Sequence, residues 1–273
     1  MTTIDWGALM SPYPHDGRGG KLLSYAIKPP KDKPGEMLLL CGPEEVADQI
    51  WNAAGAICGQ ATLSEKGKKK YTHAIYFPGG VPDFIKDLAE MLTTCLSIPA
   101  PDHVDLAVAL DWYNQPDEEG EIVRTTAGYW IWTTKHASHP EFSNSRTSRR
   151  QMIAALVTFI ESHPLFAEAE AIVTAPGHDA DGKSFGEVLA REVAKRVGIP
   201  FVESSSPGPR AAQKETPLDL SDVFTVQSQL SGTVIVLDDV FHTGGSATGA
   251  AAAARRAGAT TVLSLVVART IRK

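Results

Sequence analysis

The stretch from Val234 to Ala250, VIVLDDVFHTGGSATGA, restricts the possible folds of this chain more than any other. Residues 234–237 are apolar and mostly β-branched, which predicts a short strand buried on both faces of a sheet. Asp238 and Asp239 follow where that strand is expected to end, and residues 243–246 predict a turn that opens an alanine-rich helix. A buried strand that leads through a glycine turn into a helix is typical of a parallel α/β sheet.

The chemistry at the end of this strand suits a phosphorylated ligand that also carries hydroxyl groups. In a parallel sheet, ligands bind outside the carboxyl ends of the strands. There, residues 243–246 combine backbone N–H groups, two hydroxyls and a helix N-terminus, which together can bind a phosphate. Asp238 and Asp239 would repel that phosphate, so we expect them to bind a ribose diol or a magnesium ion shared with it. The alternative is a tight turn whose two aspartates are only solvated.

The motif resembles the PRPP-binding motif of type I phosphoribosyltransferases, where PRPP is 5-phosphoribosyl 1-diphosphate. Here it reads VIVL-DD-V-FH-TGGS, which matches that family at the defining positions. The resemblance implies that Asp238 and Asp239 hold the ribose 2′- and 3′-hydroxyls, directly or through the Mg²⁺ of Mg²⁺-PRPP. It also implies a site that wraps the 5′-phosphate, made of Thr243, Gly244, Gly245, Ser246 and Ala247.

The second half of the chain alternates strands and helices regularly, which predicts a mainly parallel, Rossmann-like sheet with helices on both faces. The expected segments are a strand at 171–175, a glycine-rich loop at 176–183, a helix at 184–197, and strands at 200–203 and 261–267. This order also matches the type I phosphoribosyltransferase core over about residues 145–273. The resemblance implies that Ala175, Pro176 and Gly177 bind the pyrophosphate group of PRPP through backbone amides, with His178 beside them.

Residues 204–231 form a long polar insertion, and insertions of this length in compact domains are usually functional loops. Arg210 and Lys214 within it are candidates for neutralising pyrophosphate as it departs, although any exposed loop of this length would contain a few cations. His242 precedes the Thr-Gly-Gly-Ser turn and is a candidate general base or ring contact, with a surface histidine as the alternative. Phe241 either stacks on the acceptor or packs beneath the loop.

Residues around Lys183 are similar to the competence-protein-F branch of the family. That branch usually carries Arg-Gly-Phe-Asn-Gln at the start of the helix, whereas this chain reads Lys183-Ser184-Phe185-Gly186. The same branch often has an N-terminal four-cysteine zinc ribbon, which this chain cannot build from Cys41, Cys58 and Cys95.

The N-terminal half predicts a separate mixed α/β region, and we place the boundary between residues 142 and 143. Its expected strands lie at 37–41, 74–77 and 104–113, with a second antiparallel strand at 122–134. One helix is expected to open at residues 42–45, and another to span 83–95. The polar, basic stretch 143–150 is the expected junction, followed by a helix over 151–162.

Composition narrows the possible partners and location. The net charge is −6, which argues against a general nucleic-acid footprint, and no apolar run approaches the length of a membrane span. Three separated cysteines and the lack of a secretory signal favour a reducing, cytoplasmic location. The basic clusters 66–70 and 146–150 are interpreted as solvated faces, with phosphate or nucleic-acid contact as the alternative. His136 and His139 have ligand-like spacing but lack a third ligand.

Together these observations predict a cytoplasmic, Mg²⁺-dependent phosphoribosyltransferase of nucleotide metabolism. It would bind PRPP and displace pyrophosphate with a nucleobase or another nitrogen acceptor. The alternative is a non-catalytic protein of the same fold that senses PRPP or a nucleotide. A homodimer is compatible with the resemblance, because dimers are common in that superfamily.

Overall fold

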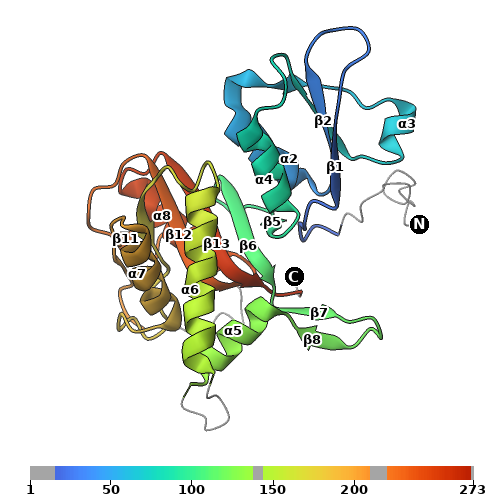
Figure 1. Ribbon diagram of the computed structural model, residues 1–273. Helices are drawn as coiled ribbons and strands as arrows, with labels where there is room; N and C mark the ends of the chain where they lie inside the picture. Colours follow the sequence, from blue (N-terminus) through green and yellow to red (C-terminus); the bar gives the residue numbers. More distant parts are fainter. Residues whose placement is uncertain (1–15, 138–143, 210–219, 272–273) are drawn as a thin grey trace, which may run out of the picture. The chain divides into compact units, whose positions relative to one another are not determined.

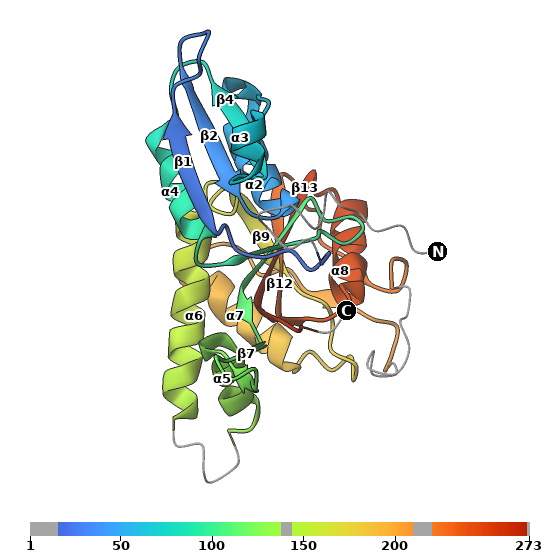
Figure 2. The same ribbon diagram turned by 90° about the vertical axis from the view of Figure 1, so that its right-hand side faces the viewer.

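The computed structural model describes residues 16–137, 144–209 and 220–271, and the chain divides into two compact units after Pro99. The sequence patterns placed the boundary between residues 142 and 143, whereas the residues from Ala100 onward pack with the second unit. Figures 1 and 2 show the described elements of each unit. Within the described residues, none of the helices combines the length and the apolar character needed to cross a membrane.

Unit 1 is the predicted mixed α/β region, built on an antiparallel sheet in the order β1-β2-β4-β3. The strands of this sheet are β1 (Ser24–Lys28), β2 (Glu36–Cys41), β3 (Gly59–Gln60) and β4 (His73–Phe77). Unit 1 also contains the short strand β5 (Leu96–Ile98), which is not part of that sheet. The helices are α2 (Glu44–Ala54), a 3-10 turn η1 (Gly55–Ile57), α3 (Glu65–Lys68) and α4 (Asp83–Leu92). Helices α2 and α4 pack against each other and bury most of the apolar residues spaced along them, whereas Ile57 after α2 and Phe84 in α4 are exposed.

Unit 2 is the predicted parallel α/β fold, with β6, β13, β12 and β9 side by side and every neighbouring pair parallel. Its strands are β6 (Leu106–Trp112), β7 (Asn114–Pro116), β8 (Ile122–Arg124), β9 (Ala169–Val173), β10 (Ser204–Ser205), β11 (Thr225–Val226), β12 (Thr233–Phe241) and β13 (Thr261–Arg269). Its helices are α5 (Thr126–Lys135), α6 (Ser145–Ser162), α7 (Phe185–Val197) and α8 (Gly245–Arg256). The predicted strand at 200–203 is reduced to a parallel bridge between Phe201 and Ile172 beside β9.

In unit 2, the order in which the chain adds strands to the sheet reverses direction between β9 and β12. From β9 the chain passes through α7 to the bridge at Phe201, on one side of β9. The chain then returns to β12, on the other side of β9, and passes through α8 to β13. Right-handed crossovers in opposite directions place their helices on opposite faces of the sheet, and Figure 2 shows α7 and α8 separated by β12. A crevice therefore opens at the carboxyl ends of β9 and β12.

The prediction of an antiparallel strand over residues 122–134 is wrong. Within that range Ile122–Arg124 is a strand, whereas residues 126–135 form α5. Thr125 caps this helix by accepting a hydrogen bond from the Gly128 N–H at 3.1 Å, and its hydroxyl donates to the Trp112 carbonyl. A Cβ atom on Gly128 would lie 1.9 Å from the Tyr113 carbonyl oxygen, so the glycine lets α5 lie directly against the chain that follows β6. Helix α5 packs along α6, as Figure 1 shows.

Two further segments differ from their predicted limits. Strand β12 continues to Phe241, so Asp238 and Asp239 lie inside the strand and not after its end. Helix α6 begins at Ser145, so part of the predicted junction is helical. The described parts of the insertion 204–231 pair as β10 with β11, and Leu220 and Phe224 are buried against α8.

Candidate functional site

A cavity of about 380 Å³ lies at the switch between β9 and β12. Two groups of residues predicted from the sequence line it: Ala175 to Gly177 after β9, and Asp238, Asp239 and Ser246 around the end of β12. The remaining lining residues are Lys135, His178, Asp179, Asp181, Lys183, Ser184, Phe185 and Gly186. The cavity therefore brings together the loop at 175–177 and the residues around the end of β12, which are about 60 residues apart in the sequence.

Asp238 is held in place by its own backbone and by the start of α7. The Asp239 N–H donates to Asp238 Oδ1 at 2.8 Å. Gly186 permits a close approach, because a Cβ atom at this position would lie 2.6 Å from the same oxygen. Burial and the negative charge of Asp239 raise the pKa of Asp238, although the Asp239 N–H and the Lys135 ammonium act in the opposite direction. The acid pair therefore resists carrying two negative charges.

Asp239 is buried and forms an ion pair with Lys135, the last residue of α5. Sequence reasoning missed Lys135, because the segment around it was interpreted as a strand and the contact depends on how α5 folds back. The Lys135 ammonium also lies 5.4 Å from the centroid of the Phe185 ring. Lys135 thus contacts the acid pair from α5, which lies before the region of about residues 145–273 that the sequence predicts as the core.

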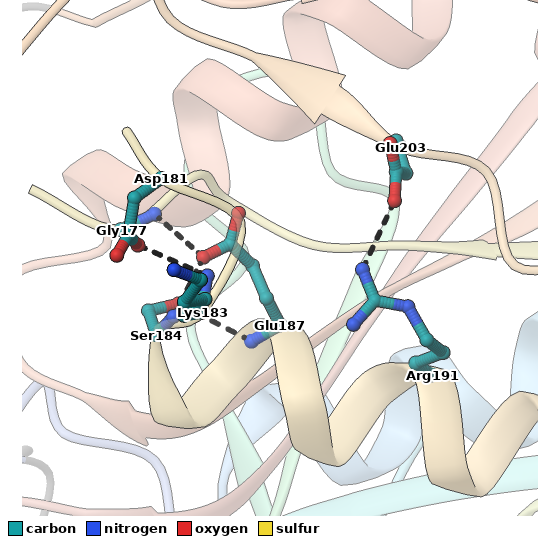
Figure 3. Close-up of polar contacts among 7 residues, drawn as sticks. All are labelled: Gly177, Asp181, Lys183, Ser184, Glu187, Arg191 and Glu203. Carbon is teal, nitrogen blue, oxygen red and sulfur yellow. Dashed lines mark hydrogen bonds and ion pairs between the residues drawn. The ribbon is translucent and has the colours of Figure 1, made fainter. Parts of the chain in front are cut away.

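The loop after β9 is fixed to the first turn of α7 by the carboxylate of Glu187 (Figure 3). Glu187 Oε2 accepts from the Ser184 N–H at 3.0 Å and from the Gly177 N–H at 3.3 Å, while the Ser184 hydroxyl accepts from the Glu187 N–H. The first and last of these bonds form a capping box. A Cβ atom on Gly177 would lie 2.5 Å from the Ser184 Cβ, so only glycine fits where the loop meets the helix.

The predicted glycine turn forms the N-terminus of α8. Gly244 is the N-cap residue with a φ of 88°, a left-handed conformation that favours glycine. A second cavity of about 60 Å³ lies here, lined by the predicted residues His242, Thr243, Gly244, Ser246 and Ala247 and by Asp238, Val240, Phe241 and Val266. Gly245 is the first residue of α8. Asp238 and Ser246 line both cavities, so the turn adjoins the acid pair.

The two candidate residues before the turn have different environments. Phe241 is buried, and its ring lies 5.3 Å from the Arg269 guanidinium, which supports packing beneath the loop. His242 is exposed, and its Nδ1 lies 3.1 Å from the Thr270 hydroxyl. Arg210 and Lys214 lie outside the described residues.

The acid pair is the part of the site that suits a metal shared with a bound ligand. No group of three or more histidine, cysteine, aspartate or glutamate residues that could hold a metal occurs within residues 16–137, 144–209 and 220–271. Asp238 and Asp239 offer carboxylate oxygens, which Mg²⁺ prefers, but most of its ligands would have to come from a bound substrate or water. His136 is described and bonds through Nδ1 to the Trp132 carbonyl at 2.7 Å, whereas His139 lies outside the described residues.

Comparison of the chain with known proteins found similar solved structures. An adenine phosphoribosyltransferase matches with 19% identity and a TM-score of 0.37, over 58% of this chain and 84% of the other. Adenine phosphoribosyltransferase from Saccharomyces cerevisiae, in complex with an imino-altritol bisphosphate and adenine, matches with 18% identity and a TM-score of 0.36, over 58% and 82%. Orotate phosphoribosyltransferase from Aeropyrum pernix matches with 18% identity and a TM-score of 0.33, over 56% and 71%. No protein-family model and no curated protein sequence matches the chain.

Proposed function

We propose that unit 2 is a phosphoribosyltransferase that takes Mg²⁺-PRPP and transfers its phosphoribosyl group to a nucleobase or another nitrogen acceptor. The observation that carries this proposal is the meeting of two segments at the switch between β9 and β12. The acid pair Asp238–Asp239 and the glycine turn come from one side, and the loop 175–177 comes from the other. Together they offer a partner for each polar part of PRPP.

The ribose and its 5′-phosphate would bind around the end of β12. Asp238 and Asp239 would accept hydrogen bonds from the 2′- and 3′-hydroxyls, and Gly186 leaves room for the Asp238 carboxylate. The N–H groups at the start of α8 would bind the 5′-phosphate, because Gly244 has no side chain to cap them and the helix dipole favours an anion there.

The pyrophosphate group would lie along the loop at residues 175–177. Glu187 and Ser184 hold this loop to α7, so its backbone is ordered before a ligand arrives. The acid pair fits a magnesium ion that shares its ligands with PRPP, and such an ion supplies charge neutralisation for the diphosphate. The protein would contribute Asp238 and Asp239 to that ion, directly or through water.

Transfer exchanges one bond for another at C1′ of the ribose. The acceptor nitrogen forms a bond to C1′ as the bond from C1′ to the diphosphate oxygen breaks, and the electron pair of the broken bond leaves with pyrophosphate. The site contributes by holding the ribose and phosphate groups in line for this exchange. When the acceptor nitrogen carries a proton, His242 is the residue we propose to remove it, with Thr270 orienting its ring. Arg210 and Lys214 remain proposed contacts of the departing pyrophosphate.

Calorimetric titration of PRPP with and without Mg²⁺, on wild type and on the double variant Asp238→Asn/Asp239→Asn, tests the proposal. We expect Mg²⁺-dependent binding that the double variant loses, followed by pyrophosphate release when a nucleobase acceptor is added. A matched control is Glu118→Gln/Glu119→Gln, which neutralises two adjacent exposed acids in the turn between β7 and β8 of the same unit.

The outcomes separate the proposed function from its alternative. Binding of PRPP or of a nucleoside monophosphate without turnover of any nucleobase would support a sensing protein of the same fold. A wild-type protein that binds neither ligand would overturn both.

A further inference from the structure

Lys135 is a charged residue of the cavity to which the binding of PRPP described above assigns no role. Its ammonium pairs with Asp239, and its side chain is 40% exposed while that of Asp239 is 11% exposed. The acid is thus enclosed, but the cation is solvated enough to move. A ribose hydroxyl bound to Asp239 would compete with the ammonium for the same carboxylate oxygens, and a diphosphate bound beside it would offer Lys135 a second, more highly charged anionic partner.

Helix α5 fixes the region that Lys135 can reach. Thr125 caps the helix, and Gly128 seats its first turn against Tyr113. The Thr133 hydroxyl bonds back to the Tyr129 carbonyl at 2.8 Å near the other end. The helix holds the backbone of Lys135 in place, so a change in the position of its ammonium must come from rotation of the side chain. The negative end of the helix dipole also favours a cation there.

The charges around the cavity show why a further cation is needed. Its lining contains four aspartates, namely Asp179, Asp181, Asp238 and Asp239, but two lysines, Lys135 and Lys183. An anionic diphosphate would therefore enter a site whose formal charge is already negative. Mg²⁺ would offset part of this repulsion, and a positioned ammonium would offset more.

A neighbouring cavity of about 240 Å³ shares part of its lining with the main cavity, and none of its lining residues is an acid that could hold Lys135 once it leaves Asp239. Lys135, Lys183 and Phe185 line both cavities. The other lining residues of the neighbouring cavity are Thr134, Arg149, Met152, Val188 and Leu189, so it contains three cations and no acid. Arg149 is itself paired with Glu192 at 2.5 Å. The Lys135 ammonium lies 5.4 Å from the centroid of the Phe185 ring, close enough for a cation–π contact.

We propose that Lys135 is a diphosphate-binding residue: its ammonium leaves Asp239 when the ribose diol arrives and then pairs with the pyrophosphate group of PRPP. This inference rests on the proposed function. The Lys135 ammonium neutralises the negative charge that develops on pyrophosphate as the C1′–O bond breaks.

Calorimetric titration with three separate probes tests the role of Lys135. The probes are PRPP, inorganic pyrophosphate and ribose 5-phosphate, and the proteins are wild type, Lys135→Met, Lys135→Arg and Lys195→Met. Lys195 is an exposed lysine on α7 that lines neither cavity and serves as the matched control. We expect Lys135→Met to weaken binding of pyrophosphate and PRPP by about tenfold or more, because it removes a charge-assisted contact. Lys135→Arg should recover most of that loss.

Ribose 5-phosphate distinguishes a ligand contact from a structural one. It lacks the diphosphate, so Lys135→Met should bind it as tightly as wild type or more tightly, because Asp239 is released from its ion pair. A variant that loses pyrophosphate and ribose 5-phosphate equally would show that Lys135 only positions Asp239, and would overturn the inference. Unchanged pyrophosphate and PRPP binding in Lys135→Met would overturn it as well. In either case wild-type binding of PRPP would leave the proposed function standing, whereas a wild type that binds neither PRPP nor ribose 5-phosphate would remove both.

Discussion

Gly186 determines where the Asp238 carboxylate can lie. A Cβ atom at this position would approach Asp238 Oδ1 to 2.6 Å, and that oxygen is already held by the Asp239 N–H at 2.8 Å. We expect Gly186→Ala to turn the carboxylate away from this bond and to weaken PRPP binding by at least about tenfold, the loss typical of a charge-assisted hydrogen bond. Calorimetry with Mg²⁺-PRPP measures the change.

The same substitution should leave the fold intact, which separates its effect from unfolding. Alanine is favoured over glycine inside a helix by about 1 kcal/mol, and this gain opposes the cost of moving the aspartate. The melting temperature of Gly186→Ala should therefore stay close to that of Lys195→Ala, a substitution at an exposed position of the same helix. Wild-type affinity in Gly186→Ala would show that Asp238 does not need its present orientation.

The residues of the site differ in how well a sequence can reveal them. Asp238, Asp239 and the Thr243–Ser246 turn are contiguous, so one strand-to-helix pattern predicts their position. Gly186 and Lys135 reach the same carboxylates from other elements, and nothing in their local sequence marks the contact. The contacts of Gly186 and Lys135 with the acid pair depend on how α7 and α5 pack, and residue spacing in the sequence does not predict that packing.

At the scale of elements, the parallel sheet of unit 2 could be predicted and α5 could not. The strands of the sheet are continuous apolar runs, and such runs are typical of strands buried on both faces. The segment at Tyr129–Trp132 is rich in aromatic residues, which favour a strand by propensity, yet it forms a helix. The cap at Thr125 and the close contact at Gly128 decide the outcome. Only the cap is a local signal that the sequence could have supplied.

His163 at the end of α6 makes the stability of unit 2 depend on pH. Its side chain is buried between Phe159 and Phe166, and its Nδ1 accepts a hydrogen bond from the Leu165 N–H at 3.2 Å. Burial lowers the pKa of His163 from 6.5 to about 3. Between these values the unfolded chain binds a proton that the folded chain does not, so stability is complete above pH 6.5 and falls as the pH decreases.

The expected loss is about 1.4 kcal/mol per pH unit once the pH is well below 6.5. Urea unfolding of wild type and of His163→Asn from pH 7.5 to 4.5 measures it. Asparagine keeps an acceptor near the Leu165 N–H but does not titrate, so the variant should show the smaller slope whatever its absolute stability. Equal slopes would mean that His163 is accessible to protons in the folded protein.

At the scale of the whole molecule, every residue that lines the cavity belongs to unit 2. The net charge of the chain is −6, and its two basic clusters lie in different units. Within the first cluster Lys68 pairs with Glu65 at 2.7 Å, and within the second Arg149 pairs with Glu192 at 2.5 Å. These pairs reduce the positive charge that either cluster could offer to a polyanion.

Binding to nucleic acid should consequently be weak, because nonspecific affinity depends on how many phosphates the protein neutralises. We expect a dissociation constant above about 100 µM for a mixed-sequence single-stranded DNA or RNA at 150 mM salt, the weak end of nonspecific binding. Fluorescence anisotropy of a labelled oligonucleotide at several salt concentrations measures it. Micromolar binding with a steep salt dependence, lost when Lys66, Lys69 and Lys70 are changed to glutamine, would instead show that unit 1 binds nucleic acid. The net charge of −6 and the ion pairs of Lys68 and Arg149 argue against that result.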